Sequence, residues 1–366
     1  MQRIPLRAFW PIGLLFLLVS SLVRAQSDDY IISRQGSVTL LPVYELWQDS
    51  LGFHQASVVL SVYVPVTRSM SFSLRGSGAV AGGDIGDLSG FSDIQVGWNY
   101  HIEQANTILS LGINAPTGKK ELSAQEFARS VVLSNSLFNL QVPVLGQGFN
   151  VNPGAAWVFP VSDDAILGLA AGYQYRGPYK PREGDPDYDP GDEITASAGI
   201  DYRLTESISV STDFVFTNYL ADKFGSNKVF ASGNSYWVNA QYKQYFRENE
   251  LLVFVGYRTK SKGQIQGAGG LVDERDRLEP GRFDFQGEFR QVFNQRFSLG
   301  YQLVARVFET TPVPLSGAKV YGAGLAPTFS FGRFSVPVHL LGQIGTLKGG
   351  KTIKGFEAGA GISVAF

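Results

Sequence analysis

The chain ends in the stretch FEAGAGISVAF, residues 356–366. Its even-numbered residues are all apolar, whereas Glu, Gly, Ser and Ala lie between them. Because the side chains of a β-strand alternate between two faces, the stretch predicts a strand with one continuous apolar face. A chain that stops on an aromatic residue in such a strand is typical of outer-membrane β-barrels. Phe366 is therefore the expected signal for the barrel-assembly machinery.

The other end of the chain has the pattern of a secretory signal peptide. Arg3 and Arg7 precede an apolar segment over residues 9–23, and Val23-Arg24-Ala25 offers a small-residue cleavage site. An uncleaved membrane anchor is the alternative, but the apolar segment is short for a span of about 20 residues. We therefore expect a signal peptide over 1–25 and one outer-membrane barrel domain over 26–366.

Composition excludes several classes of protein. After residue 25 the chain has no apolar run as long as a transmembrane helix. Removing the three arginines of residues 1–25 from 31 basic residues leaves 28 against 32 acidic residues, a net charge of −4. With this charge and no basic run, nucleic acid is not an expected partner. The chain has no cysteine, so a secreted fold must be held by burial and backbone hydrogen bonds, as in a closed barrel.

Strand patterns recur along the whole mature chain and predict an all-β fold, a transmembrane antiparallel up-and-down barrel. Sixteen segments have one apolar face and lengths near the roughly 9–11 residues of a tilted transmembrane strand. An even number also places both ends of the barrel on the periplasmic side. Fourteen is the alternative number, if 37–48 or a weaker segment lies outside the wall. The expected strands are 37–48, 56–66, 69–80, 91–102, 107–115, 147–160, 165–177, 193–204, 207–219, 235–246, 251–260, 281–293, 297–309, 319–331, 334–346 and 354–366.

The connections between these strands alternate in length. Brief polar turns are expected at 67–68, 161–164, 205–206, 247–250 and 294–296. Long connections are expected at 81–90, 116–146, 178–192, 220–234, 261–280 and 310–318. Short turns on the periplasmic side and long loops outside are typical of bacterial barrels, whereas a soluble sandwich has no reason to alternate. No repeat and no Pro/Gly linker divides the chain, which predicts a single domain.

Charged residues share the face opposite the apolar one. That face must line the lumen, because a charge facing lipid costs about 2–4 kcal/mol near the midplane of the bilayer. The expected lumen-lining residues are Asp93, Asp201, Arg203, Asp213, Lys243, Arg258, Asp284, Glu288, Arg290 and Arg306. Their mixed sign is consistent with cross-strand ion pairs that brace the barrel or with a wet pathway that orients a solute.

Aromatic residues near the strand ends are candidates for the girdles at the two membrane interfaces. They are Trp47, Trp98, Tyr100, Trp157, Tyr219, Tyr236 and Tyr257.

Two neighbouring stretches, GFSDIQVGWNY at 90–100 and LSLGINAPTGK at 109–119, carry a family resemblance. They resemble the Gly-x-x-Asp strand and the Pro-Thr-Gly strand end of outer-membrane proteins of the phenol-degradation MetA type, which are related to the fatty-acid and toluene transporter barrels. GYQYRGPY at 172–179 is also similar to that group. The resemblance covers about residues 90–180 and implies a barrel that lets small, often hydrophobic or aromatic, compounds cross the outer membrane.

The residues of the Pro-Thr-Gly end also have a direct physical reading. Pro116 ends its strand because it cannot donate to the ladder, and Gly118 permits a turn with positive φ. Pro116, Thr117 and Gly118 thus begin the long 116–146 loop, which we expect to fold inward or to lie over the mouth as a gate. Asp93 is expected to bond to loop backbone. The fatty-acid barrels also carry a plug with an Asn-Pro-Ala motif, which is absent from residues 26–36 before the first expected strand.

Signals for catalysis and metal binding are poor. The chain has only His54, His101 and His339, and no nucleophile elbow, P-loop or zinc motif. His101 and His339 are expected near strand ends on the polar face and His54 in a loop. Asp185, Asp187 and Asp189 have calcium-like spacing, but Pro190 and Ala196 replace the Gly and Glu of an EF-hand loop. We expect a solvated outer loop there, with a weak calcium site as the alternative, and no catalytic residues or cofactor.

These patterns predict a passive outer-membrane channel for small molecules. The alternatives are a structural or adhesive barrel sealed by ion pairs and, third, a membrane-embedded hydrolase. The expected partners are outer-membrane lipid, the barrel-assembly machinery and small-molecule solutes, and the expected state is a monomer.

Overall fold

The computed structural model describes residues 35–48, 52–119, 121–313 and 316–366. The expected signal peptide at 1–25 lies outside the described residues.

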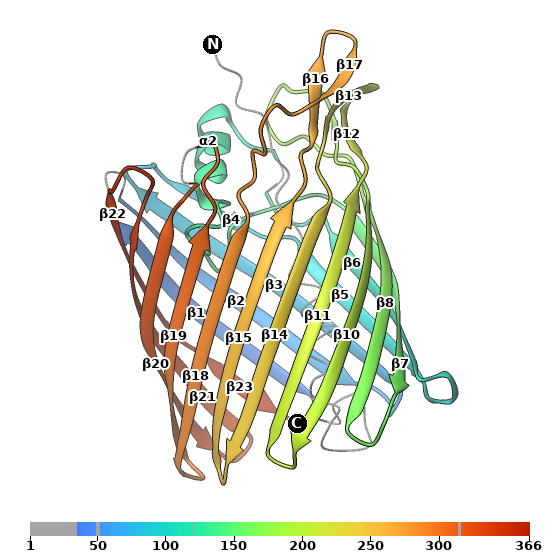
Figure 1. The fold of residues 1–366 in the computed structure, drawn as a ribbon. Helices are drawn as coiled ribbons and strands as arrows, with labels where there is room; N and C mark the ends of the chain where they lie inside the picture. Colours follow the sequence, from blue (N-terminus) through green and yellow to red (C-terminus); the bar gives the residue numbers. More distant parts are fainter. Residues whose placement is uncertain (1–34, 49–51, 120, 314–315) are drawn as a thin grey trace.

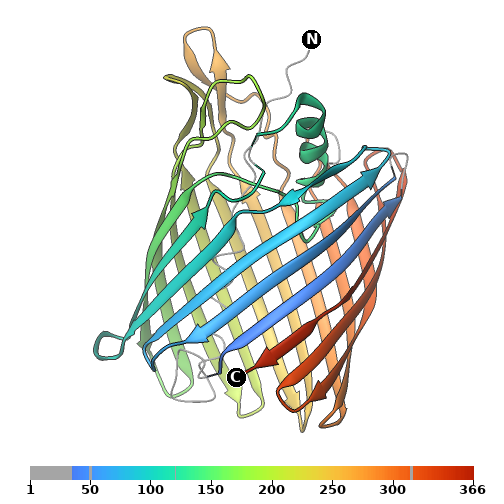
Figure 2. The same ribbon diagram turned by 180° about the vertical axis from the view of Figure 1, so that it is seen from behind.

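The chain forms a closed antiparallel barrel in which each wall strand pairs with its neighbours in the sequence (Figure 1; from behind, Figure 2). In the part of the chain that the structure describes, eighteen strands make one sheet, and because β4 with β5 and β22 with β23 each share one place in the wall, the barrel has sixteen wall positions. The expected number of sixteen strands is confirmed. The wall consists of β1 (Ser37–Gln48), β2 (Phe53–Pro65), β3 (Met70–Gly83), β4 (Leu88–Phe91), β5 (Ile94–Ile102), β6 (Thr107–Ala115), β7 (Asn150–Pro160), β8 (Ala165–Arg176), β10 (Glu193–Thr205), β11 (Ile208–Tyr219), β14 (Ser235–Phe246), β15 (Asn249–Lys260), β18 (Arg282–Asn294), β19 (Phe297–Phe308), β20 (Lys319–Phe331), β21 (Phe334–Thr346), β22 (Thr352–Ala360) and β23 (Ile362–Ala365).

The first and last strands close the barrel. β1 pairs with β22 over Val43–Gln48 and with β23 over Ser37–Leu40. The backbones of Gly36 and Phe366 exchange two further hydrogen bonds of 2.9 and 3.0 Å. The ladder therefore extends to the last residue of the sequence.

The two faces of the wall follow the alternation of the sequence. In β10, Ile194, Ile200 and Leu204 are 48%, 44% and 52% exposed on the outer face, as suits contact with lipid. Glu193 and Asp201 occupy the opposite face, where Glu193 is buried. The register of β10 against β8 and β11 keeps this alternation across the neighbouring strands, because a slip of one residue would turn the charges toward lipid.

Short turns join the strands at the lower end in Figure 1, and the long connections lie at the upper end. By the rule for bacterial barrels, the upper end is the extracellular one. A 3₁₀ turn (η2, Glu103–Ala105) lies in one of the short connections. His54, expected in a loop, lies in β2, because that strand begins at Phe53 rather than at residue 56.

A second sheet rises from the extracellular rim above β11, β14 and β15 (Figure 1). Its five strands come from three different long connections, in the order β17-β16-β13-β12-β9. They are β9 (Tyr188–Asp189), β12 (Ala221–Phe224), β13 (Asn227–Ala231), β16 (Gln264–Gly267) and β17 (Gly270–Asp273).

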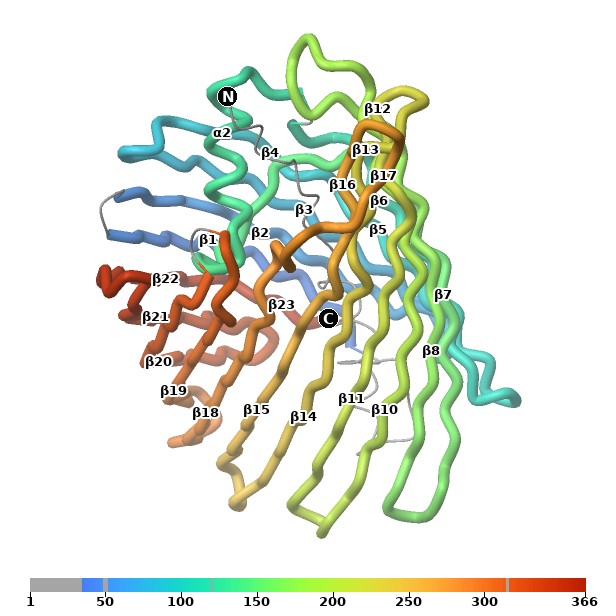
Figure 3. Tube along the Cα trace, turned by 45° about the horizontal axis from the view of Figure 1, so that its top comes forward, coloured from blue at the N-terminus to red at the C-terminus, as the bar shows by residue number. Residues whose placement is uncertain are grey.

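The connection between β6 and β7, the inward loop, packs against the inner wall at the mouth, and it carries helix α2 (Ala124–Leu133), which stands at the upper end of the barrel (Figure 1 and Figure 3). Ser123 caps α2 in a reciprocal capping box with Glu126, which satisfies two backbone N–H groups at the start of the helix. None of the helices described is long and apolar enough to cross a membrane.

The apolar core of the protein lies at the mouth, between this loop and the barrel wall. Leu133, Leu137 and Leu140 of the loop are buried in a cluster with residues of β1, β2, β3, β19, β20 and β22. Phe138 packs edge-on against Trp47 and Phe53, with ring centroids 5.5 and 4.8 Å apart. Trp47 was expected in an outer girdle, but it points inward and is 3% exposed, because the loop supplies an apolar surface inside the barrel.

Candidate functional site: the extracellular mouth and its inward loop

The base of the inward loop is tied to Asp93, which interrupts the wall strand between β4 and β5. The Asp93 carboxylate accepts hydrogen bonds from the backbone N–H of Gly118 (2.8 Å) and Gln147 (2.6 Å) and from the Asn114 amide (3.0 Å). One buried side chain thus joins both ends of the loop to the wall, in line with the expectation that Asp93 bonds to loop backbone.

Gly118 is needed here for a reason other than the expected one. It is not among the residues with positive φ, so the expected left-handed turn is wrong. A Cβ at this position would lie 2.1 Å from the carbonyl oxygen of Leu145 and 2.8 Å from the backbone nitrogen of Asp93. The two ends of the loop pass so close to each other that no side chain fits between them.

A second attachment joins the loop to β1 and β2. Glu45 and Gln55 are register partners on the inner face, and both are almost fully buried. Gln55 donates to the carbonyl of Val142 (2.9 Å) and accepts from its N–H (3.2 Å), while the Glu45 carboxylate accepts from the N–H of Gln141 (3.0 and 3.2 Å). These side chains satisfy loop backbone that would otherwise be buried without partners.

The outer part of the loop is held by charged groups. Arg129 of α2 donates to the carbonyl oxygens of Ile85 (3.0 Å) and Asp87 (2.5 Å) on the β3–β4 connection. The Glu126 carboxylate bonds to Lys119 and accepts from Ser123, and these contacts lower the pKa of Glu126. Asp93, the Glu45–Gln55 pair and these contacts hold the loop as a fixed partition within the mouth.

A cavity of about 670 Å³ separates the inward loop from the opposite side of the barrel. Its lining is mainly apolar and includes Phe127, Val131, Val144, Tyr179 and Phe308. The volume is within the roughly 300–1,000 Å³ of small-molecule sites.

Charged groups come to the cavity from the opposite wall. Arg176 of β8, Arg258 of β15 and Arg282 of β18 line it, together with Glu279 of the β15–β18 connection. Arg176 forms a buried ion pair with Glu193 at 3.0 Å, and the Glu279 carboxylate lies 3.0 Å from the Lys260 ammonium. The cavity lining thus combines the many apolar residues of the loop with charged groups that come mainly from the wall.

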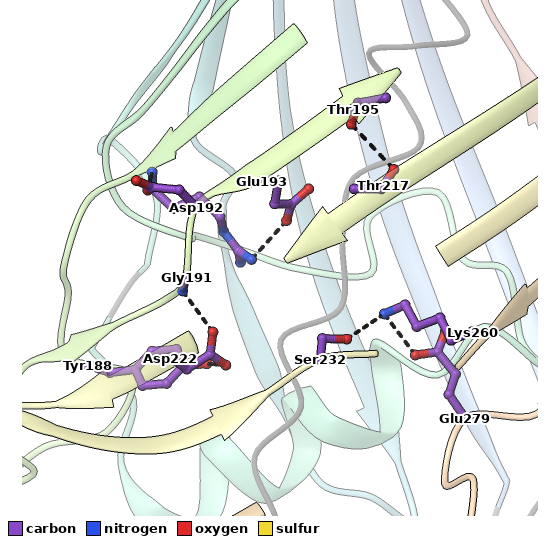
Figure 4. A network of polar contacts seen from close by, with 11 residues as sticks. Tyr188, Gly191, Asp192, Glu193, Thr195, Thr217, Asp222, Ser232, Lys260 and Glu279 are labelled. Atoms are coloured by element: carbon purple, nitrogen blue, oxygen red, sulfur yellow. Dashed lines mark hydrogen bonds and ion pairs between the residues drawn. The ribbon is translucent and has the colours of Figure 1, made fainter. Parts of the chain in front are cut away.

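Polar contacts join the barrel wall to the projecting sheet close to these charged groups (Figure 4). Asp222 accepts hydrogen bonds from the Tyr188 hydroxyl (2.6 Å) and from the Gly191 N–H (2.7 Å). Burial raises the pKa of both Tyr188 and Asp222, so the hydroxyl stays protonated as the donor. Lys260 also bonds to Ser232 at 3.2 Å, which joins the β11–β14 connection to the same network.

Of the ten residues expected in the lumen, only Arg258 lines this cavity. Asp93 lines a smaller polar cavity of about 110 Å³ beside the loop, together with Arg75, Gln95 and Asn114. Arg203 lies at the periplasmic rim, where it pairs with Asp164 of a short turn.

The other expected lumen residues are distributed over the inner wall, mostly in pairs. Arg306 of β19 bonds to Gln343 at 2.6 Å and is the register partner of Asp284. Asp201 and Asp213 are diagonal neighbours on β10 and β11. The remaining contacts are Arg282–Asp284, Arg290–Glu288 and Lys243–Glu250.

The acidic loop is held by cations of the protein itself. Asp185 pairs with Arg182 at 2.6 Å, and Asp189 pairs with Lys223 at 3.1 Å. Within the described ranges there is no group of three or more His, Cys, Asp or Glu that could hold a metal ion. The geometry adds no support for a calcium site at Asp185, Asp187 and Asp189.

Sequence reasoning missed several residues of the mouth. Glu45 and Gln55 carry a signal that could have revealed them, since each is a polar residue on the face that the alternation turns inward. Arg176 and Glu193 stand at the two ends of the 177–192 connection, where buried pairing follows only from the spatial approach of the strands. Nothing in the sequence of residues 127–145 indicates which wall strands they contact.

The sequence and the structure were compared with those of known proteins. No family model and no curated protein sequence matches the chain. Its structure is similar to CdiB from Acinetobacter baumannii, with 7% sequence identity and a TM-score of 0.56 over 90% of this chain, which spans 60% of CdiB. It is also similar to OprB from Pseudomonas putida, with 10% identity and a TM-score of 0.51 over 97% of this chain and 96% of OprB. The CymD monoaromatic hydrocarbon channel has a TM-score of 0.48 at 9% identity, over 98% of this chain and 94% of CymD.

The fold and the outer surface locate the protein. A closed sixteen-stranded barrel with an apolar outer face pairs the backbone groups of its strands within the wall, as a lipid environment requires. The protein is a β-barrel of the bacterial outer membrane.

Proposed function

We propose that this protein is a passive channel that admits small molecules with apolar or aromatic bodies through the outer membrane. The observation that carries the proposal is the cavity of about 670 Å³ at the extracellular mouth, lined in large part by apolar residues of the inward loop. A barrel that served only as a scaffold has no need for a partition folded into its mouth. The resemblance of residues 90–119 to barrels of the MetA type supports the same class of solute.

The inward loop sets the width of the route in this proposal. It enters the lumen between two fixed attachments, Asp93 at its base and the Glu45–Gln55 pair at β1 and β2. Such attachments favour a permanent constriction over a gate that swings open, because release would leave several buried polar groups without partners. Pro116, Thr117 and Gly118 begin the constriction.

Conductance in a planar bilayer tests the proposal. Deleting residues 120–140 removes α2 and part of the apolar partition, so the single-channel conductance of the refolded protein is expected to rise by about twofold or more if the loop is the constriction. Steady conductance steps from the intact protein, changed by the deletion, support the channel. Silence from both forms contradicts it.

A non-transporting adhesive barrel is the second candidate, and the projecting five-stranded sheet is the observation that favours it. Three connections combine to build this sheet outside the membrane, which is more structure than a pore entrance requires. The same bilayer experiment separates the two roles, because an adhesive barrel predicts no conductance in either form.

A further inference from the structure

Four basic side chains line the mouth cavity, and three of them have acidic partners at close range. Each of these three charges is therefore compensated within the protein. The pairs are Lys119 with Glu126, Arg176 with Glu193 at 3.0 Å and Arg282 with Asp284 at 2.8 Å.

Arg258 is the exception. No hydrogen bond or ion pair observed among the described residues includes its guanidinium, which interacts at longer range with Arg282 and, with opposite sign, with Glu279 and Asp284. Its register partner across β15 and β18 is Arg282, a second cation on the same inner face. Like charges directly opposite each other on a sheet are destabilising, so the protein keeps an arginine here at a cost in stability.

Neighbouring acids do not remove this imbalance. Glu279 also lines the cavity, but its carboxylate is bonded to Lys260 at 3.0 Å. Asp284 accepts from Arg282 and is also the register partner of Arg306. Arg258 is left as a guanidinium with unused donors in a cavity whose lining is mainly apolar.

We infer that Arg258, with Arg282 beside it, binds the carboxylate group of an amphipathic solute whose apolar body packs against the inward loop. This deepens the proposed channel function and rests on it for the passage of the solute. The planar guanidinium fork matches a carboxylate in a two-point hydrogen-bonded pair. A single uncompensated positive charge corresponds to a monoanion.

The other lining residues of the cavity indicate the chemistry of the rest of the solute. The same cavity is lined by Phe127, Val131 and Val144 of the loop and by Tyr179 and Phe308. These residues offer aromatic and aliphatic contact and few hydrogen-bonding groups. The solute class is therefore a monocarboxylate with a compact aromatic or aliphatic body.

Binding to the purified, folded barrel in detergent tests this inference with two probes of the same shape, benzoate and its neutral analogue benzamide. Calorimetric titration of the unaltered protein is expected to give about tenfold tighter binding of benzoate, and Arg258→Gln should remove that preference. Arg258→Lys keeps the positive charge but lacks the planar guanidinium fork, so this variant should retain part of the preference for benzoate. Arg203→Gln is the matched control, because Arg203 pairs with Asp164 at the far rim and does not line the cavity.

Folding of each variant is checked by its heat-modifiable migration on gels. Equal binding of benzoate and benzamide to the unaltered protein overturns the inference, as does an unchanged preference in Arg258→Gln. Uptake of both probes into proteoliposomes separates the two proposals. Benzoate binding without uptake of either probe contradicts the channel and leaves the carboxylate site standing, whereas equal uptake and equal binding contradict the site and leave the channel.

Discussion

At the scale of single residues, the mouth depends on positions where one side chain, or its absence, decides a contact. Asp93 joins both ends of the inward loop through three hydrogen bonds. Gly118 lets these ends pass each other, since a Cβ there would lie 2.1 Å from the Leu145 carbonyl oxygen. The roles of Asp93 and Gly118 do not follow from their residue types alone, because each depends on a contact with residues distant in the sequence.

Replacing Gly118 tests this packing. Gly118→Ala should displace the base of the loop and destabilise the folded protein by about 1–3 kcal/mol, because the clashing atoms belong to backbone. Unfolding in guanidinium and proteolysis of the loop measure the two effects. Gly168→Ala is the control, since a Cβ at Gly168 meets no atom within 4 Å. Equal unfolding free energies and equal rates of loop proteolysis for the two variants would show that Gly118 is not tightly enclosed.

At the scale of elements, helix α2 and its loop form the inner partition, and the helix start is held by Glu126. The bonds of Glu126 to Lys119 and Ser123 lower its pKa below the ordinary value of 4.5. A carboxyl group with a lowered pKa in the folded state stabilises that state above its ordinary pKa. This contribution is lost as the pH falls through the folded value.

Acid should therefore loosen α2 before it unfolds the barrel. Digestion of the loop by an acid-active protease is expected to speed up as the pH falls below the ordinary glutamate pKa. Glu126→Gln should raise the rate at neutral pH and flatten its pH dependence. The exposed Glu121 of the same loop provides the control, as Glu121→Gln should leave the pH profile unchanged. A pH profile that is the same in all three proteins would rule out this role of Glu126.

At the scale of the whole molecule, one continuous ladder closes the wall from β1 to β23 and extends to Phe366. The Phe366 ring lies against Gly36, where a Cβ would approach it to 2.5 Å, and it remains 55% exposed. The backbone bonds of Phe366 do not depend on its side chain. The ring is thus of limited value for closure, and we propose that it is recognised during assembly.

Phe366→Ala should accordingly lower the amount of folded barrel in cell membranes by about twofold or more, while refolding into detergent changes little, because half-burial of one ring contributes only about 1–2 kcal/mol. Phe334→Ala is matched in size and exposure, at 54%. Equal membrane levels of the two variants would remove the case for Phe366 as the assembly signal.

The wall itself was predictable from the sequence to within a few residues. The alternation in segments such as 193–204 and 281–293 identified both the strands and the face of each that turns inward. Lipid outside the barrel makes this pattern strict, because a charge that faces lipid is costly. The loops at 116–146 and 220–234 were recognised as long, but their sequences did not indicate that one folds inward and the other joins a projecting sheet.

The sequence by itself determined the class of fold and predicted for each strand which face its charged residues share, because these depend on alternation within one strand and on the solvent that each face meets. It favoured sixteen wall strands over fourteen, and the structure decided between them. Only the tertiary structure decided which charges are compensated. Arg176 and Arg258 are alike as inward arginines near the mouth, yet the pairing of β8 with β10 brings Glu193 to the first, and the pairing of β15 with β18 brings Arg282 to the second. Electrostatic pairing depends on distances across strands and loops, and such distances exist only once the strands have paired in register.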